Sequence, residues 1–110
     1  MHLREKDRIR IIALAEKCFQ SPIEIWAYGS RVNGDSHEGS DLDLVIKSKN
    51  DEPIDWHELE NFQEALRDSN IPILVEPKDW HRIPLSFQKN ILRKYEVLFS
   101  NIELNKKTAI

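Results

Sequence analysis

The sequence predicts a small α/β fold, in which a mixed β-sheet has helices packed on it. Segments with helical periodicity alternate along the chain with short runs of β-forming residues, which is the order typical of layered α/β structures. The chain has 110 residues and a mass of 13.0 kDa, a size that suits one domain. We expect this domain to cover residues 1–104 and a polar tail to cover residues 105–110.

Three helices are predicted from apolar residues that recur on one helical face. The second begins with Asp55 and Glu58, which resemble a capping box, and ends at the polar stretch 68–70. The predicted helices and their apolar faces are residues 4–19 with Ile11, Leu14, Ala15 and Cys18, the capped helix with Leu59, Phe62 and Leu66, and residues 85–95 with Phe87, Ile91, Leu92 and Tyr95.

Three strands are predicted between these helices, over residues 23–28, 41–46 and 71–76. Pro72 favours the beginning or the edge of the third strand, and Pro77 predicts a bend after it. Residues 29–40 contain all three glycines together with Ser, Asn, Asp and His, so they are expected to form a long polar loop. This concentration of backbone freedom is the first indication of a functional site.

Composition excludes several classes of function. The net charge is -3 with both signs interleaved, so duplex DNA is not the expected partner. Cys18 is the only cysteine, which rules out an intrachain disulfide and a cysteine-based zinc site and fits a cytoplasmic protein. The four histidines lack paired metal spacing, and the three tryptophans are expected to pack in the core or at its edge. No apolar run approaches the roughly 20 residues that cross a bilayer.

Asp41 and Asp43 are the first candidate catalytic and metal-binding residues. In a strand, side chains two residues apart point the same way, with Cα atoms about 6.5 to 7 Å apart. Two such carboxylates can jointly bind a divalent cation. A solvated strand face would show the same pattern, so the pair alone leaves both interpretations open.

Gly29 and Ser30 end the strand that precedes this pair. Glycine permits close backbone approach, and main-chain N–H groups with the Ser30 hydroxyl can bind phosphate. An ordinary turn is the alternative interpretation. Arg31 follows directly, and it is a candidate phosphate clamp or an ordinary surface arginine.

Gly29-Ser30, ten residues, and then Asp41-Leu42-Asp43 form a joint motif that is far more specific than either half. Together with its neighbours in residues 27–34 and 39–46, it resembles the signature of the DNA polymerase beta-like nucleotidyltransferase superfamily. Within that superfamily the string resembles the minimal nucleotidyltransferase (MNT) branch. The resemblance implies a polymerase beta palm-like fold, with Gly29, Ser30, Arg31 and Ser40 at the nucleotide's phosphates.

The resemblance also implies a third metal-binding carboxylate on the next strand, at the position of Glu76. The family usually has aspartate there. Glu76 would complete the catalytic and metal-binding set with Asp41 and Asp43, which would hold two Mg²⁺ ions. Asp79 is an alternative third carboxylate, although its place beside Trp80 favours a helix-capping role.

For function, the resemblance implies transfer of AMP from ATP to a hydroxyl group. MNT proteins are commonly antitoxins that adenylylate a tyrosine of a HEPN-domain ribonuclease toxin, so a HEPN toxin is the expected partner, in a homo- or hetero-oligomer. One alternative is a non-catalytic antitoxin that neutralises its partner by covering it. Another is an antibiotic-modifying nucleotidyltransferase, which usually carries an added helical domain.

Overall fold

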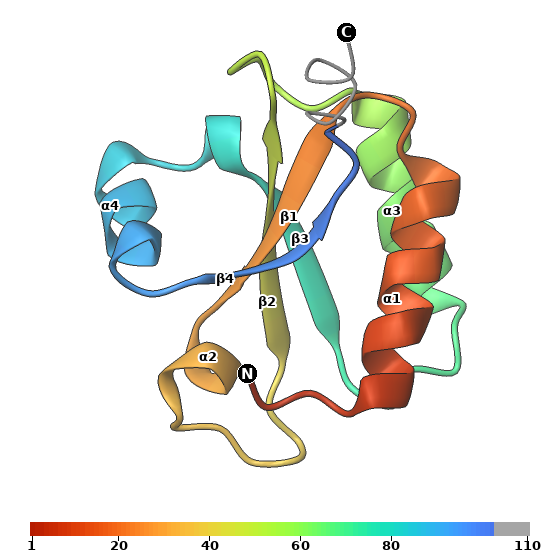
Figure 1. The fold of residues 1–110 in the computed structure, drawn as a ribbon, viewed down its shortest axis with the longest axis vertical. Helices are drawn as coiled ribbons and strands as arrows, with labels where there is room; N and C mark the ends of the chain where they lie inside the picture. The colour runs from red at the N-terminus through yellow and green to blue at the C-terminus, as the bar shows by residue number, and fades with distance from the viewer. Residues whose placement is uncertain (103–110) are drawn as a thin grey trace, which may run out of the picture.

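A four-stranded mixed sheet organises the chain, whose residues 1–102 are described by a computed structural model (Figure 1). The strand order is β3-β2-β1-β4; β1 runs antiparallel to β2 and β4, and β2 runs parallel to β3. The elements are α1 (Glu5–Cys18), β1 (Ile23–Tyr28), α2 (Ser30–Asn33), β2 (Leu42–Ser48), α3 (Trp56–Arg67), β3 (Val75–Asp79), the 3₁₀ helix η1 (Trp80–Arg82), α4 (Leu85–Arg93) and β4 (Glu96–Ser100). The predicted α/β class and mixed sheet are confirmed.

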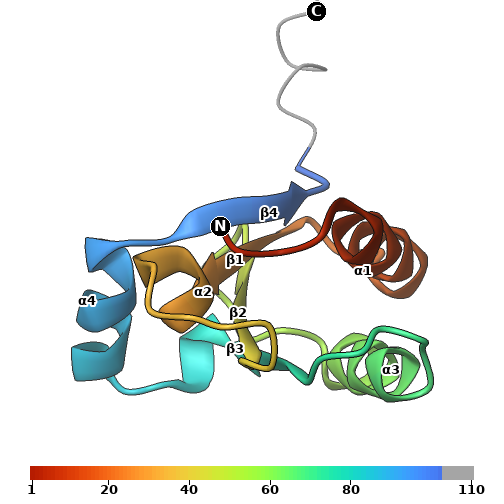
Figure 2. The ribbon, with the colours of Figure 1, turned by 90° about the horizontal axis from the view of Figure 1, so that it is seen from below.

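The two faces of the sheet are covered differently (Figure 2). Helices α1 and α3 lie side by side on one face and α4 lies on the other, while α2 lies at one end of the sheet. The first face carries the larger apolar core, in which Ile11, Leu44 and Phe62 are fully buried. The second face carries a smaller cluster of Trp26, Tyr28, Val45, Trp80 and Ile91. The second face therefore has a smaller apolar core than the first.

The predicted helix α3 is confirmed in its buried face and in half of its capping box. Leu59, Phe62 and Leu66 are buried, and the Asp55 carboxylate accepts hydrogen bonds from the N–H groups of His57 and Glu58. Glu58 does not return the bond to Asp55. Its side chain instead accepts from the Gln20 N–H at 2.9 Å, which ties α3 to the end of α1.

The third strand differs from the prediction in position. It begins at Val75 and continues to Asp79, because pairing with β2 starts where Val75 meets Leu42. The predicted bend at Pro77 is absent, and β3 continues through it to Asp79. Because β3 is the edge strand of the sheet, it can accommodate a proline, which has no N–H to donate to a neighbouring strand. Leu74, inside the predicted strand, lies before the observed one and is exposed.

Two further elements differ from the prediction. The predicted loop contains the short helix α2, and strand β4 follows α4, which ends at Arg93. Leu92 and Tyr95, predicted on the apolar face of this helix, are exposed: Leu92 lies within α4, and Tyr95 lies beyond its end and stacks on Trp26 with ring centroids 4.3 Å apart. Of the three tryptophans expected in the core or at its edge, Trp26 and Trp80 are buried, whereas Trp56 is 58% exposed and lies outside the core.

No helix within residues 1–102 combines the length and apolar character needed to span a bilayer. The predicted polar tail, residues 105–110, lies outside the described part of the chain.

Candidate active site

Three polar side chains form a row across neighbouring strands on the second face of the sheet. Tyr28 of β1 is paired with Asp43 of β2, which is paired in turn with Glu76 of β3. Directly paired residues point to the same side of a sheet, with strands about 4.8 Å apart. Asp43 and Glu76 therefore lie on adjacent strands, as the sequence suggested for the third carboxylate.

Asp41 stands outside this row. It immediately precedes β2 and is exposed. Within residues 1–102, no group of three or more His, Cys, Asp or Glu side chains is arranged to hold a metal ion. The structure thus brings Asp43 and Glu76 together and leaves Asp41 beside them, at the end of a loop.

The electrostatics of the row indicate accumulated negative charge. The pKa of Asp43 is raised by partial burial and by the carboxylates of Glu76 and Asp41, while Lys78 lowers it. Burial, followed by the charges of Asp43 and Glu76, raises the pKa of Tyr28 to about 12. A cation placed here would relieve the repulsion. The ligand atoms of these carboxylates are oxygens, which fit a hard divalent ion such as Mg²⁺ because such ions prefer oxygen ligands.

Gly29 joins the two halves of the motif in space. Its backbone has φ 84° and ψ -157°, a conformation that residues with a Cβ rarely adopt. A Cβ at this position would lie 2.7 Å from Oδ2 of Asp43. Glycine is therefore required both by the backbone angle and by the close approach of the carboxylate.

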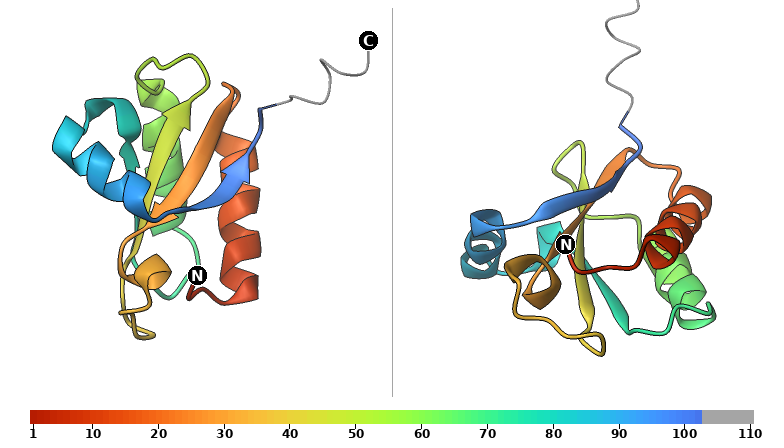
Figure 3. Two further views of the ribbon diagram at one scale, coloured as in Figure 1. Left: turned by 60° about the vertical axis from the view of Figure 1, so that its left-hand side comes forward. Right: turned by 60° about the horizontal axis from the view of Figure 1, so that its bottom comes forward.

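Ser30 and Ser40 lie at the two ends of the connecting loop. Ser30 begins α2, and its carbonyl accepts from the N–H groups of Gly34 and Asp35. The Ser40 hydroxyl accepts from the His37 N–H at 3.0 Å. This loop and α2 project at one end of the sheet (Figure 3).

Arg31 is neither a surface arginine nor an outward-facing clamp. It is 4% exposed, and its guanidinium donates to the main-chain carbonyls of His2, Glu38 and Ser40. The side chain is thus turned toward the protein's own backbone. Its expected place at a phosphate does not follow from this geometry.

A cleft of about 420 Å³ opens beside Tyr28 and Gly29. Its opposite wall is formed by α4 and the residue after it, which contribute Asn90, Arg93 and Lys94. Two cations and an amide next to the glycine-serine turn suit a phosphorylated ligand. These α4 residues were not predicted as site residues. The available signal was charge: residues 80–95 contain no Asp or Glu, whereas the chain has nineteen.

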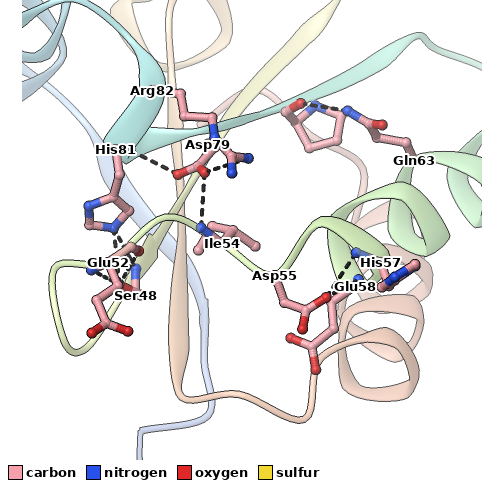
Figure 4. Close-up of polar contacts among 11 residues, drawn as sticks. Ser48, Glu52, Ile54, Asp55, His57, Glu58, Gln63, Asp79, His81 and Arg82 are labelled. Carbon is pink, nitrogen blue, oxygen red and sulfur yellow. Dashed lines mark hydrogen bonds and ion pairs between the residues drawn. The ribbon is translucent and has the colours of Figure 1, made fainter.

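Asp79, the alternative third carboxylate, has a structural role (Figure 4). It accepts from the N–H groups of Ile54 and His81, both at 2.9 Å, and pairs with Arg82 at 3.3 Å. These bonds cap η1 and fix the segment that leads into α3. The expected capping role of Asp79 is confirmed.

His81 extends this network to β2. Its Nε2 accepts from the Ser48 N–H at 3.0 Å, which requires the neutral ring, and burial lowers the pKa of His81. The Ser48 hydroxyl lies 3.1 Å from the same nitrogen and is also bonded to the backbone of Glu52 (Figure 4). Ser48 and His81 therefore hold a loop in place.

The fold and the joint motif define a nucleotidyltransferase. The chain belongs to the family described as polymerase beta, nucleotidyltransferase, whose model matches residues 10–104. It is 38% identical over 88 residues to the probable protein adenylyltransferase MntA of Haemophilus influenzae, covering 78% of this chain and 75% of that protein. The resemblance to the MNT branch is thereby confirmed.

Two solved structures share the fold. One, a crystal structure of a toxin-antitoxin with AMP-PNP, superposes with a TM-score of 0.67 at 18% identity and covers 84% of this chain and 72% of its own. The other, from Shewanella oneidensis, has a TM-score of 0.64 at 10% identity and covers 88% and 72%. At these identities the likeness concerns the fold.

Proposed function

We propose that this chain is a Mg²⁺-dependent protein adenylyltransferase, which transfers AMP from ATP to a tyrosine hydroxyl of a HEPN-domain toxin and thereby acts as its antitoxin. The observation that carries the proposal is the pairing of Asp43 with Glu76 directly beside Gly29. The MntA relative supports adenylyl transfer, and the structural neighbour with AMP-PNP supports ATP and a toxin partner. The single cysteine favours the cytoplasm.

In the reaction, a bond forms between the acceptor oxygen and the α-phosphorus of ATP, and the bond from that phosphorus to the bridging oxygen breaks, so that pyrophosphate leaves. The acceptor's proton passes to a carboxylate, for which Glu76 is the candidate. Two bound Mg²⁺ ions would neutralise the triphosphate and favour the ionised acceptor. Asp41, Asp43 and Glu76 would hold these ions once the Asp41 side chain turns inward.

The remaining residues serve binding. Gly29 lines the cleft, and the main-chain N–H groups of Gly29 and Ser30, with the hydroxyls of Ser30 and Ser40, are the proposed phosphate donors. Arg93 and Lys94, on the opposite wall, suit the departing pyrophosphate.

The test is to incubate the chain with labelled ATP, Mg²⁺ and the toxin encoded beside it. We expect label on a toxin tyrosine, loss of label with Asp43→Asn and Glu76→Gln, and retention with Glu76→Asp, which restores the family's usual residue. Absence of transfer, or transfer that survives Asp43→Asn, would reject the proposal.

A second candidate is an antitoxin that acts by occlusion alone. It is favoured by the separate position of Asp41, which leaves no ready three-carboxylate group in residues 1–102. If the Asp41→Asn and Asp43→Asn proteins still protect cells from the toxin, occlusion is favoured over chemistry.

A further inference from the structure

Arg31 is a buried cation with an unusual set of partners. Asp7, Arg31 and Asp79 are the buried charged residues within the described chain. Asp7 and Asp79 each pair with an arginine, Arg4 and Arg82 respectively. Arg31 has no such ion pair among residues 1–102, and three main-chain carbonyls accept its bonds instead. Burying an uncompensated charge is costly, so the arrangement calls for a specific explanation.

The three carbonyls belong to two segments of the chain: Glu38 and Ser40 lie in the loop before β2, and His2 lies in the N-terminal segment. Nε donates to Ser40 O at 2.9 Å, Nη2 to Glu38 O at 2.9 Å and Nη1 to His2 O at 2.6 Å. The His2 N–H donates back to the Arg31 carbonyl at 2.8 Å. The N-terminal segment accordingly lies beside α2 (Figure 3). One planar side chain thus joins α2, the loop and the N-terminal segment.

The bond to Ser40 matters most, because Ser40 directly precedes Asp41. Within the loop, Ser40 N–H donates to His37 O, and Gly39 N–H donates to His37 Nδ1. Those bonds close the turn on itself, whereas the Arg31 bonds attach the turn to α2. Asp43 is held independently by the strand pairing of β2. Asp41 thus lies between two attachments: Arg31 fixes the loop before it, and Leu42 after it donates its N–H to the Leu74 carbonyl at 2.9 Å.

We propose that Arg31 is a positioning residue that closes the ten-residue interval between Gly29-Ser30 and Asp41, and so sets where Asp41 stands relative to Asp43. The role of Asp41 in metal binding rests on the proposed function, whereas the position that Arg31 gives to Asp41 does not. The guanidinium of Arg31, the first residue of the interval, bonds Ser40, its last residue, which is a physical reason for the length of the interval. Lysine cannot replace it, because a single ammonium nitrogen cannot serve three carbonyls in one plane.

The test compares Arg31→Lys and Arg31→Met with Asp79→Asn, which removes a buried charge at the other end of the sheet. Amide hydrogen exchange is measured on each protein without nucleotide or metal. We expect exchange at the Gly39 and Ser40 amides to rise about tenfold or more in both Arg31 variants, as local opening becomes easier, and to stay unchanged in Asp79→Asn. Wild-type protection of these two amides in Arg31→Lys would overturn the inference.

Mg²⁺·ATP titration of the same proteins provides the functional readout. The affinity should fall about 10- to 100-fold in both Arg31 variants, as when an outer-shell partner is lost, and lysine should not rescue it. An equal loss in Asp79→Asn would overturn the inference, since it would reflect stability alone. If wild-type protein binds Mg²⁺·ATP but transfers no label, the proposed function fails while the positioning role stands.

A further measurement covers the case in which the Arg31 variants do not fold. In wild-type protein, the Arg31 Nε proton is followed by nuclear magnetic resonance. A proton bonded to Ser40 O in a buried site should exchange with water far more slowly than those of exposed arginines such as Arg67. Exchange as fast as that of the exposed arginines would contradict the inference without any substitution.

Discussion

The two carboxylates Asp43 and Asp79 lie on adjacent strands but near opposite ends of the sheet, and their surroundings differ in kind. Asp79 is buried and fully engaged, with two N–H donors and an arginine. Asp43 is half-buried between Tyr28 and Glu76, and the like charge of Glu76 raises its pKa together with burial. Asp79 thus has hydrogen-bond and ion-pair partners within the protein, whereas Asp43 lies beside a second carboxylate that a bound cation would neutralise.

This difference separates a structural carboxylate from a candidate functional one more clearly than sequence position does. A structural carboxylate accepts hydrogen bonds from donors of its own chain, whereas a functional site holds like-charged groups that repel one another until a ligand binds. Substitutions at the two carboxylates should therefore have opposite effects on stability and activity.

Asp43→Asn should abolish catalysis while leaving the fold intact or more stable. Loss of a preorganised contact to the transition state predicts about a 1000-fold fall in transfer, or ~4 kcal/mol. The pKa of Asp43 is raised in the folded state, so its contribution to the free energy of unfolding is fully present below the ordinary pKa of 3.8 and is lost as pH rises through the raised pKa. At pH 7 the ionised carboxylate therefore destabilises wild type, and the Asp43→Asn variant should unfold at a higher denaturant concentration. This difference between the two unfolding midpoints should narrow below pH 4.

Asp79→Ala should show the reverse pattern. It leaves the buried N–H groups of Ile54 and His81 without their acceptor, which predicts a loss of about 3 kcal/mol in the free energy of unfolding. Denaturant titration measures the loss. Transfer activity per folded molecule should remain near wild type; a selective loss of activity would erase the distinction between the two carboxylates.

Gly29→Ala should lower both stability and activity. The left-handed backbone and the clash with Asp43 predict a cost of about 2 kcal/mol and a displaced carboxylate. Gly34→Ala is the matched control, because Gly34 also has positive φ, at 92°, but nothing lies within 4 Å of its Cβ position. Gly34→Ala should cost stability and keep Mg²⁺·ATP binding. Equal binding loss in both variants would argue against a special contact between Gly29 and Asp43.

The smallest expected effect concerns His81 in the Asp79 network. Its pKa is lowered from 6.5, so its contribution to stability is complete above that value and is lost as pH falls toward the lowered value. Chemical denaturation at pH 5 and pH 7.5 should show this loss in wild type. His81→Gln keeps an acceptor for the Ser48 N–H and should reduce the pH difference; an unchanged difference would assign it to other groups.

The motif residues were predictable because their types carry the chemistry. Gly29, Asp41 and Asp43 stand at a specific interval, and alternation along β2 placed Asp43 on the polar face, whereas Asp41 precedes the strand. The sequence also located the apolar face of α3, since Leu59, Phe62 and Leu66 repeat at helical spacing.

What escaped prediction depends on tertiary contacts. Strand β4 is short and buries only Leu98 fully, so periodicity gave no signal. The role of Arg31 depends on carbonyls up to 29 residues away. Arg93 and Lys94 reach the cleft because α4 packs on the second face of the sheet, which local sequence does not reveal.

We expect Mg²⁺ to be bound jointly by Asp41, Asp43 and Glu76 beside the turn formed by Gly29. The most direct measurement is calorimetric titration of Mg²⁺ with a non-hydrolysable ATP analogue into wild type and the Asp41→Asn, Asp43→Asn, Glu76→Gln and Asp79→Asn variants. Wild type should show metal-dependent binding, which the first three substitutions should abolish and the last one should spare. Binding that is absent from wild type, or that persists without Asp43, would contradict a joint carboxylate site.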